Sequence, residues 1–359
     1  MTEWRDCKFG EIATFSYGKM PNKKNIVDCG YPIFSGYKIV GYYNSYMYED
    51  PQLIIVARGV GGTGDVKISP PKSYITNLSI IAELHPDKAN KKFLYYYFKI
   101  NNLRELDSGS AQSQITINDL NNYCITLPPL PEQKAIADVL SSLDDKIDLL
   151  TKQNKTLEDL AQAYFRKWFI EDASDEWEVG KLGDYIEIHD SKRVPLSKIE
   201  REKMKSGTLY PYYGAATIMD YVNDYIFDGE YILMGEDGTV ETEDGYPVLQ
   251  YATGKFWVNN HAHVLTAKSP FNNYFIWFFL KQCNISGIVT GAVQPKINQE
   301  NLKNIDIPIP DLTLINSANQ FFANIFAKIL NNLEQIKTFQ KLRDTLLPKL
   351  ISGEIRLKM

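Results

Sequence analysis

Two long stretches of the chain place hydrophobic residues at alternating steps of four and three, which is the spacing of a helix face that packs on another helix. The first stretch follows a proline-rich break at 127–131, and the second follows one at 307–310. The pattern predicts two long α-helices, over 131–170 and 313–347, neither with an internal proline or glycine.

The segment ahead of each helix has a different pattern. Residues 1–127 and 177–309 are rich in β-branched residues, tyrosine and glycine, with short apolar runs typical of buried strands, such as Leu53–Ala57 and Tyr231–Met234. A short apolar helix is predicted late in each segment, at Phe93–Ile100 and Asn273–Gln282.

The two segments are copies of one unit. Trp4–Gly10 resembles Trp177–Gly183, and Tyr31–Gly36 resembles Tyr210–Ala215. Further matches occur in the same order: Leu53–Gly59 with Tyr231–Gly238, Thr76–Ile80 with Asn259–His263, and Gln112, Ile115, Leu120 and Pro128 with Gln294, Ile297, Leu302 and Pro310. Two copies are too few for a solenoid, so we expect two tandem globular domains.

The expected fold is therefore α/β (mixed α+β), with two similar globular domains that are each followed by a long helix. The predicted limits are a first domain at 1–130, its helix at 131–173, a second domain at 174–312, and the second helix with a C-terminal tail at 313–359. The two helices are expected to pair as an antiparallel coiled coil with pseudo-two-fold symmetry. Forty helical residues span ~60 Å, which would separate the two domains.

One asparagine interrupts each apolar seam near its middle, Asn154 in the first and Asn332 in the second. An antiparallel pairing aligned on the seam centres would make these two side chains face each other. A buried amide pair is satisfied in one register and unsatisfied in shifted ones, so we interpret it as a register lock. The alternative is that each asparagine points to solvent at an imperfect heptad position.

Composition agrees with a globular protein of 359 residues, with 44% hydrophobic and 23% charged residues. Four scattered cysteines without a CxxC pair favour a reducing compartment. The N-terminus has no apolar signal core, and no apolar run approaches the ~20 residues of a membrane helix. The sequence predicts a soluble, cytoplasmic protein without a membrane partner.

Motifs for catalysis and cofactors are absent or incomplete. Residues 59–64 fit GxGxxG, but a proline pair at 70–71 follows where a dinucleotide fold needs a helix. His261 and His263 are two apart on a predicted strand, yet no third metal ligand is near in sequence. We therefore expect no catalytic residue, no metal and no cofactor in this chain.

Several motifs together resemble the specificity (S) subunit of type I restriction–modification systems. They are the duplicated Trp…Gly starts, Tyr231–Gly238, Val258–Val264, and Pro128–Ala137 at the start of a long helix. The resemblance covers essentially the whole chain. It implies target recognition domains that each read half of a split site in double-stranded DNA, and paired helices that set the spacer. It also implies two methyltransferase (M) subunits that methylate adenine and motor–nuclease (R) subunits that cleave, with S-adenosylmethionine and ATP bound by those partners.

Candidate DNA contacts are polar and aromatic side chains in predicted loops and strand ends. Glutamine can read adenine, arginine can read guanine, and carboxylates can accept from cytosine amino groups. In the first domain the candidates are Lys19, Lys23, Lys24, Tyr37, Lys38, Arg58, Lys67, Gln112 and Gln114. In the second they are Lys192, Arg193, Tyr212, Tyr213, Glu236, Asp237, Gln294 and Lys296.

Charge keeps two alternatives open. The second domain is acidic: residues 175–312 carry a net charge of −8, whereas residues 1–130 carry +2. An acidic domain disfavours solitary DNA binding, so a DNA-mimicking or scaffold/antagonist protein of the same fold remains an alternative. The other is a DNA methyltransferase or nuclease with unrecognised catalytic motifs.

Overall fold

The computed structural model describes residues 4–59, 62–107, 114–291 and 294–357. It divides into two compact units. Unit 1 consists of residues 1–149 and 335–359, and unit 2 of residues 150–334. Each unit therefore combines one globular region with segments of two long helices, α3 (Leu130–Arg166) and α8 (Leu312–Ile351).

The globular region of unit 1 contains ten strands and two short α-helices among its described residues. The strands are β1 (Arg5–Lys8), β2 (Ala13–Tyr17), β3 (Ile26–Val27), β4 (Tyr31–Phe34), β5 (Ile39–Tyr43), β6 (Leu53–Val56), β7 (Val66–Ile68), β8 (Tyr74–Ile75), β9 (Ser79–Leu84) and β10 (Cys124–Leu127). The helices are α1 (Lys91–Ile100) and α2 (Ile117–Asn122), with 3₁₀ turns at Phe9–Glu11, Lys23–Asn25 and Leu103–Leu106.

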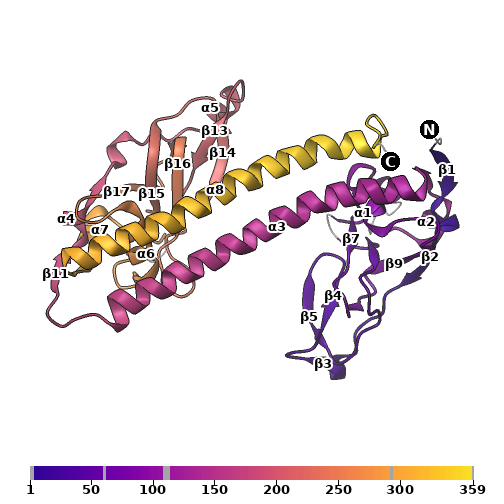
Figure 1. Cartoon of the computed structure of the whole chain (residues 1–359), viewed down its shortest axis with the longest axis horizontal. Coiled ribbons are helices and arrows are strands. Elements are labelled where there is room, and N and C mark those ends of the chain that lie inside the picture. The colour runs from indigo at the N-terminus through magenta and orange to yellow at the C-terminus, as the bar shows by residue number, and fades with distance from the viewer. Residues whose placement is uncertain (1–3, 60–61, 108–113, 292–293, 358–359) are drawn as a thin grey trace. The chain divides into compact units, whose positions relative to one another are not determined.

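A four-stranded antiparallel sheet in the order β2-β9-β6-β7 forms the centre of unit 1. Successive side chains of a strand point to opposite faces of the sheet, and all four residues of β6 are buried, so both faces of this strand lie in a core. Leu53 and Ile55 pack with α1, which lies between this sheet and α3 (Figure 1). Ile54 points the other way and packs with Phe34 and Ile75 of a second sheet, β3-β5-β4-β8. This two-sided burial explains the continuous apolar run of β6.

Unit 2 repeats this arrangement, with one six-stranded sheet in the order β12-β17-β15-β16-β13-β14. Its strands are β11 (Glu178–Lys181), β12 (Ile186–Ile188), β13 (Tyr210–Tyr213), β14 (Ile218–Val222), β15 (Phe227–Gly235), β16 (Leu249–Val258), β17 (Ala262–Ala267) and β18 (Asp306–Ile309). Its helices are α4 (Leu182–Tyr185), α5 (Lys198–Lys203), α6 (Asn273–Gln282) and α7 (Gln299–Lys303), with a 3₁₀ turn at Asp190–Lys192. α6 packs with α3 and α8 as α1 packs with α3 in unit 1.

The internal repeat extends to individual side chains. In unit 1 the rings of Tyr31 and Tyr46 meet edge to face at 4.9 Å. In unit 2 the equivalent rings of Tyr210 and Tyr225 do so at 5.3 Å. Each globular region also closes on itself with a two-stranded pair, β1–β10 in unit 1 and β11–β18 in unit 2.

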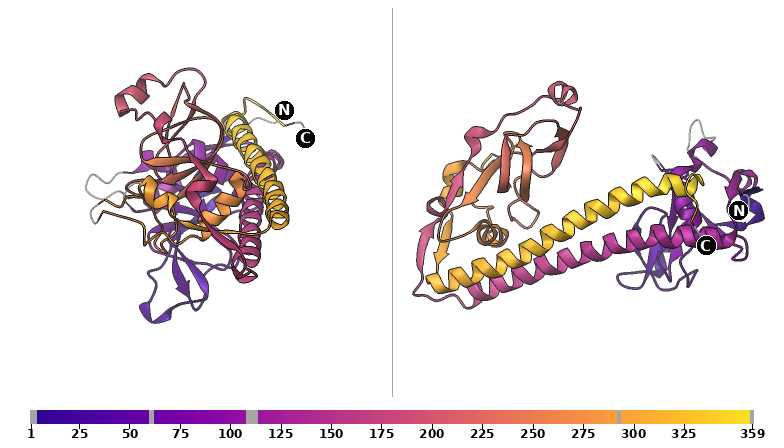
Figure 2. Two further views of the ribbon diagram at one scale, coloured as in Figure 1. Left: turned by 90° about the vertical axis from the view of Figure 1, so that its left-hand side faces the viewer. Right: turned by 45° about the horizontal axis from the view of Figure 1, so that its top comes forward.

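In each unit a segment of α3 lies beside a segment of α8 and runs in the opposite direction (Figure 2). Leu140 shares a core with Leu347 in unit 1, and Phe165 contacts Phe322 in unit 2. The predicted seams therefore face each other within each unit. Asn154 and Asn332 lie within hydrogen-bonding distance in unit 2.

The helix ends differ from the prediction. The first α-helix ends at Arg166 and continues as one π-helical turn, Lys167–Glu171, rather than as α-helix to 170. The second runs four residues past the predicted end at 347 and includes Pro348. Proline there removes one N–H, but apolar burial of Leu350 and Ile351 holds the last turn against unit 1. None of the helices in the described part is long and apolar enough to cross a membrane.

Candidate nucleic-acid interface

A ledge beyond the central strand of unit 1 brings together the backbones of three residues from three separate segments. Ala57, directly after β6, donates its N–H to the carbonyl of Leu78 at 2.9 Å and accepts from the N–H of Ile115 at 3.0 Å. The next residue, Arg58, forms an isolated antiparallel bridge with Gln114. Ala57 and Ile115 are fully buried, whereas Arg58 and Leu78 are exposed and Gln114 is half-buried. We call Arg58, Leu78 and Gln114 ledge 1.

Unit 2 builds the same ledge with other side chains. Glu236, directly after β15, donates its N–H to the carbonyl of His261 at 2.9 Å and accepts from the N–H of Ile297 at 2.8 Å. The next residue, Asp237, forms an isolated antiparallel bridge with Lys296. We call Asp237, His261 and Lys296 ledge 2. The carboxylate of Asp237 is hydrogen-bonded to Nδ1 of His261, and the side chain of Lys296 is half exposed.

A buried ion network supports ledge 2 from below. Arg193 donates to Glu236 at 2.5 Å, and its second terminal nitrogen lies 3.5 Å from Asp190. Asp190 also accepts from the Val264 N–H at 3.0 Å and pairs with His263 Nδ1 at 2.6 Å. Burial raises the pKa of Asp190, but the hydrogen bond and charge of His263, together with the Val264 N–H, outweigh it and leave that pKa below its ordinary value.

Three potential metal ligands meet in this network. One oxygen or nitrogen atom from each of Asp190, Glu236 and His263 lies within 4.8 Å of the others. The carboxylates already face the Arg193 guanidinium, and Nε2 of His263 lies 2.9 Å from the Ile297 carbonyl. A metal ion would have to displace these partners, so the donor set fits an ion-pair network better than a metal centre.

A groove of about 710 Å³ in unit 1 joins the globular region to the long-helix segments. Tyr37 and Lys67 line it together with Lys92 and Lys99 from α1. Asp144 of α3 accepts hydrogen bonds from Tyr96 of α1 and Arg343 of α8 at one wall. Burial raises the pKa of Asp144, but the hydrogen bonds from Arg343 and Tyr96 lower it overall. The three lysines remain as basic groups of the groove, and Asp145 and Asp148 of α3 line it as well.

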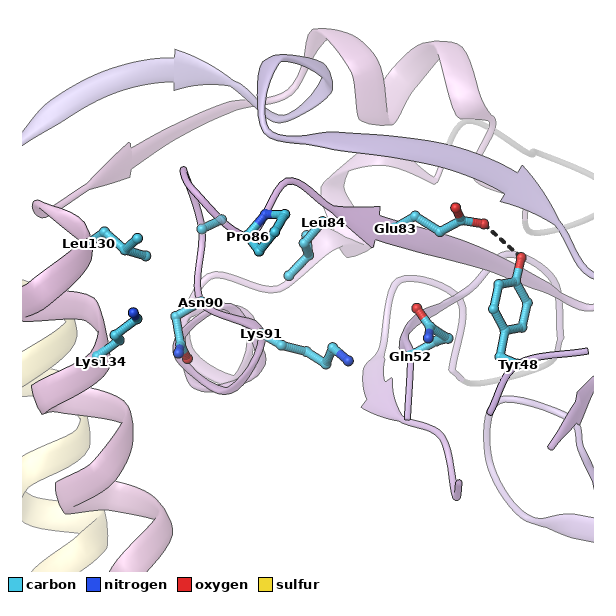
Figure 3. Close-up of a pocket in the computed structure, with 10 residues that line it drawn as sticks. Tyr48, Gln52, Glu83, Leu84, Pro86, Asn90, Lys91, Leu130 and Lys134 are labelled. Carbon is cyan, nitrogen blue, oxygen red and sulfur yellow. Dashed lines mark hydrogen bonds between the residues drawn. The ribbon is translucent and has the colours of Figure 1, made fainter. Parts of the chain in front are cut away.

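A smaller cavity of about 480 Å³ lies on unit 1 near the start of α3 (Figure 3). Tyr48 donates to Glu83 at 2.8 Å on one side, and Leu130 and Lys134 close the other. Lys91 donates to the Pro51 carbonyl, and burial lowers the pKa of Lys91 against the opposing charge of Asp50. No predicted DNA contact lines this cavity, so it is not part of the candidate interface.

The structure brings some predicted contacts together and separates others. Arg58 meets Gln114, Asp237 meets Lys296, and Tyr37 shares the groove with Lys67. Exposed positions outside the ledges are Lys19, Lys23, Lys24, Lys38, Lys192 and Gln294. Gln112 lies outside the described residues.

Four predicted contacts in unit 2 have other partners. Tyr212 is buried at 1% exposure, and its hydroxyl accepts from the Leu196 N–H at 2.9 Å, so the prediction that it contacts DNA is wrong. Tyr213 is half-buried against Phe256. Arg193 and Glu236 neutralise each other in the buried network, which leaves neither positioned as an exposed DNA contact.

Sequence reasoning missed two ledge positions and two groove lysines. Leu78 carries no polar group, and His261 was considered only as a metal ligand. The alignment of Thr76–Ile80 with Asn259–His263 already placed these two at equivalent positions. Lys92 and Lys99 lie on an apolar helix and gave no separate signal.

Comparisons with known proteins agree on one family. The model described as "Type I restriction modification DNA specificity domain" matches residues 1–159 and 174–345. The type I restriction enzyme MjaIX specificity subunit of Methanocaldococcus jannaschii is 29% identical over 315 residues, which cover 76% of this chain and 71% of that protein. A putative type I specificity subunit of Haemophilus influenzae, S.HindORF215P, is 37% identical over 150 residues, which cover 42% of this chain and 37% of that protein.

A solved structure supports the fold. The S subunit of a type I restriction–modification system from M. genitalium superposes with a TM-score of 0.71 at 20% identity. The superposition covers 99% of this chain and 96% of that one. The mixed α/β fold with two repeated globular regions and long helices is therefore shared with a known S subunit.

Proposed function

Because the chain belongs to the type I restriction–modification specificity family, whose members are non-catalytic specificity subunits, we propose that it reads a bipartite DNA site for its partner enzymes. Each globular region would read one half-site. Two M subunits would then methylate adenine, and R subunits would cleave unmethylated DNA.

The observation that carries the proposal is the repetition of one fold in two units. Both units end their central strand in the same backbone ledge, and each ledge presents side chains that can contact base edges. A repeated reader with two different sets of side chains is what a split, asymmetric site requires.

The charge distribution favours more phosphate contacts from unit 1 than from unit 2. In unit 1, Lys67, Lys92 and Lys99 line one groove and can contact a DNA backbone, with the α3 carboxylates Asp145 and Asp148 also lining it. The second globular region is acidic, and its Arg193 is neutralised by Glu236. We propose that the M subunits supply much of the phosphate contact around the second half-site.

S-adenosylmethionine and ATP would be bound by the partner subunits and not by this chain, and the complex would act in the cytoplasm. We keep 1–130 and 174–312 as the target recognition domains, with 131–173 and 313–359 supplying the helices that set the spacer.

The test is long-read mapping of methylated adenine in the host genome, with and without this gene. A split motif that disappears with the gene is the expected result. If no motif depends on the gene while the M subunits are expressed, the reader role is wrong. The acidic second region then favours a scaffold or DNA mimic, which would bind M subunits without DNA.

A further inference from the structure

The two ledges share their backbone and differ in every exposed side chain. In both, the residue directly after the central strand donates its N–H to a carbonyl just before the neighbouring strand. Its own carbonyl accepts from the N–H of an isoleucine in a later loop. The buried anchor is isoleucine in both, Ile115 and Ile297. The side-chain groups change from guanidinium, isobutyl and amide in ledge 1 to carboxylate, imidazole and ammonium in ledge 2.

This contrast separates structural from variable positions. Main-chain hydrogen bonds and a buried isoleucine form the ledge in both units. In ledge 2 the Asp237–His261 hydrogen bond and the Lys296–Glu236 ion pair add side-chain contacts. Another pair of positions is alike in the two units: half-buried Pro32 pairs with exposed Tyr42 across one hairpin, and half-buried Pro211 pairs with exposed Tyr221 across the other. A surface that reads two different half-sites must differ between the units, and the ledges do.

We propose that ledges 1 and 2 are the base-reading positions of the two units, an inference that rests on the proposed function. In ledge 1, Arg58 suits the O6 and N7 acceptors of guanine, and Gln114 suits the N6 and N7 edge of adenine. Leu78 offers apolar contact to a thymine methyl group. Ledge 1 therefore reads a different base pattern from ledge 2.

Ledge 2 carries an acidic residue, Asp237, where ledge 1 carries the basic Arg58. Asp237 accepts the Nδ1 hydrogen of His261, which leaves Nε2 as the other polar atom of this partly exposed ring. The Lys296 ammonium lies 3.4 Å from a carboxylate oxygen of Glu236, and its side chain is still half exposed, so its remaining hydrogens can be donated to guanine O6 or N7. Ledge 2 thus combines one strong donor with an oriented imidazole, and Asp237 acts as a positioning residue for that ring.

The experiment uses the full chain expressed with its M subunits in a host without adenine methylation, followed by long-read motif mapping. Arg58→Ala should relax one position of one half-site, with about 5- to 150-fold loss of discrimination there, the range for one bidentate base contact. Lys296→Ala should relax a position in the other half-site. The other half of the motif and the spacer should stay unchanged in each variant.

Lys38→Ala is the matched comparison, because Lys38 is an exposed basic residue of unit 1 outside the ledge. It should lower methylation at all sites alike without changing the motif. An unchanged motif in both Arg58→Ala and Lys296→Ala, with the wild-type split motif present, overturns the ledge assignment and leaves the proposed function intact. A wild-type complex that neither methylates nor binds DNA refutes the proposed function itself.

If Arg58→Ala abolishes all methylation, a binding measurement distinguishes a base contact from a phosphate contact. The purified variant complex is titrated with a panel of duplexes, each changed at one base pair of the wild-type motif. A flattened preference at one position, with the preferences elsewhere kept, supports the ledge as a reader. An equal loss of affinity for every duplex assigns Arg58 to the phosphate backbone and overturns the inference.

Discussion

Asn332 donates a hydrogen bond from Nδ2 to Oδ1 of Asn154 at 2.7 Å, inside the apolar seam between the α3 and α8 segments of unit 2. Asn154 in turn donates to the Ile329 carbonyl at 3.3 Å. Both side chains are buried, at 7% and 0% exposure. A shift of either helix would separate two buried amides, so the contact penalises other registers. Its role as a register lock stays a prediction.

Asn332→Leu should destabilise unit 2 by about 1–3 kcal/mol, because it leaves the buried Oδ1 of Asn154 without its donor. The double variant Asn154→Leu/Asn332→Leu should recover much of that loss, since no amide then remains unpaired. Denaturant unfolding of the full chain measures both. Asn331→Leu, on the exposed face of the same helix, is the control and should change little. Additive single and double effects would mean that the two amides are not coupled.

Arg193 was predicted to contact DNA, and the structure instead makes it a stability residue. Its side chain is 12% exposed and pairs with Glu236, which is 13% exposed. Arg193→Ala should cost about 3–5 kcal/mol of unfolding free energy, the range for breaking a buried ion pair from one side. Lys192→Ala, at the exposed neighbouring position, should cost little. The thermal unfolding midpoints of the two variants measure this difference. Equal midpoints for Arg193→Ala and Lys192→Ala would contradict a stabilising buried ion pair.

Acid should weaken unit 2 through Asp190. Its folded-state pKa lies below the ordinary 3.8, so its contribution is present above about pH 4 and is lost as pH falls through the folded pKa. His263, Arg193, Gln299 and the Val264 N–H face this carboxylate. Asp190→Asn should be less stable than the wild type at pH 7.

The pH comparison isolates that carboxylate from the other acids of the chain. Unfolding midpoints of the wild type and Asp190→Asn are measured from pH 7 down to pH 3. The difference between them should shrink as pH falls, because protonated aspartic acid and asparagine carry the same charge. A difference that stays constant over the whole range would show that folding does not lower the pKa of Asp190.

The sequence predicted the long helices well because their signal is local and periodic. Steps of four and three define a face wherever the helix lies, and Asn154 and Asn332 stand out as polar exceptions within it. The helix ends were less predictable. Tertiary packing of Leu350 and Ile351 carries the second helix through Pro348, which local propensity treats as a stop.

Candidate contacts were harder to predict because residue type does not report burial. Tyr212 lies in β13 and Tyr37 lies just after β4, and the first is 1% and the second 42% exposed. Leu78 and Arg58, twenty residues apart in sequence, meet only through backbone pairing beyond the ends of β6 and β9. Such long-range pairings set the ledges, and no local pattern encodes them.

The groove of unit 1 predicts a salt-dependent share of DNA affinity. Lys67, Lys92 and Lys99 line it, and Lys99 also lies 4.5 Å from the ring centre of Tyr95, which restrains that ammonium. Each lysine that neutralises one phosphate adds about 0.9 to the slope of log affinity against log salt. The triple alanine variant should therefore lower that slope by up to about 2.7, if all three contact phosphates.

The measurement is equilibrium binding of the complex with M subunits to a duplex that contains the mapped motif, at several salt concentrations. Affinity should fall most at low salt, and the preferred motif should not change, because phosphate contacts position the protein without reading sequence. Lys88→Ala is the control: this exposed lysine of unit 1 lies outside the groove and donates to the Glu11 carbonyl at 3.0 Å. If the triple variant keeps the wild-type slope, the groove does not face the DNA backbone, and the positive charge that binds this half-site must come from the M subunits.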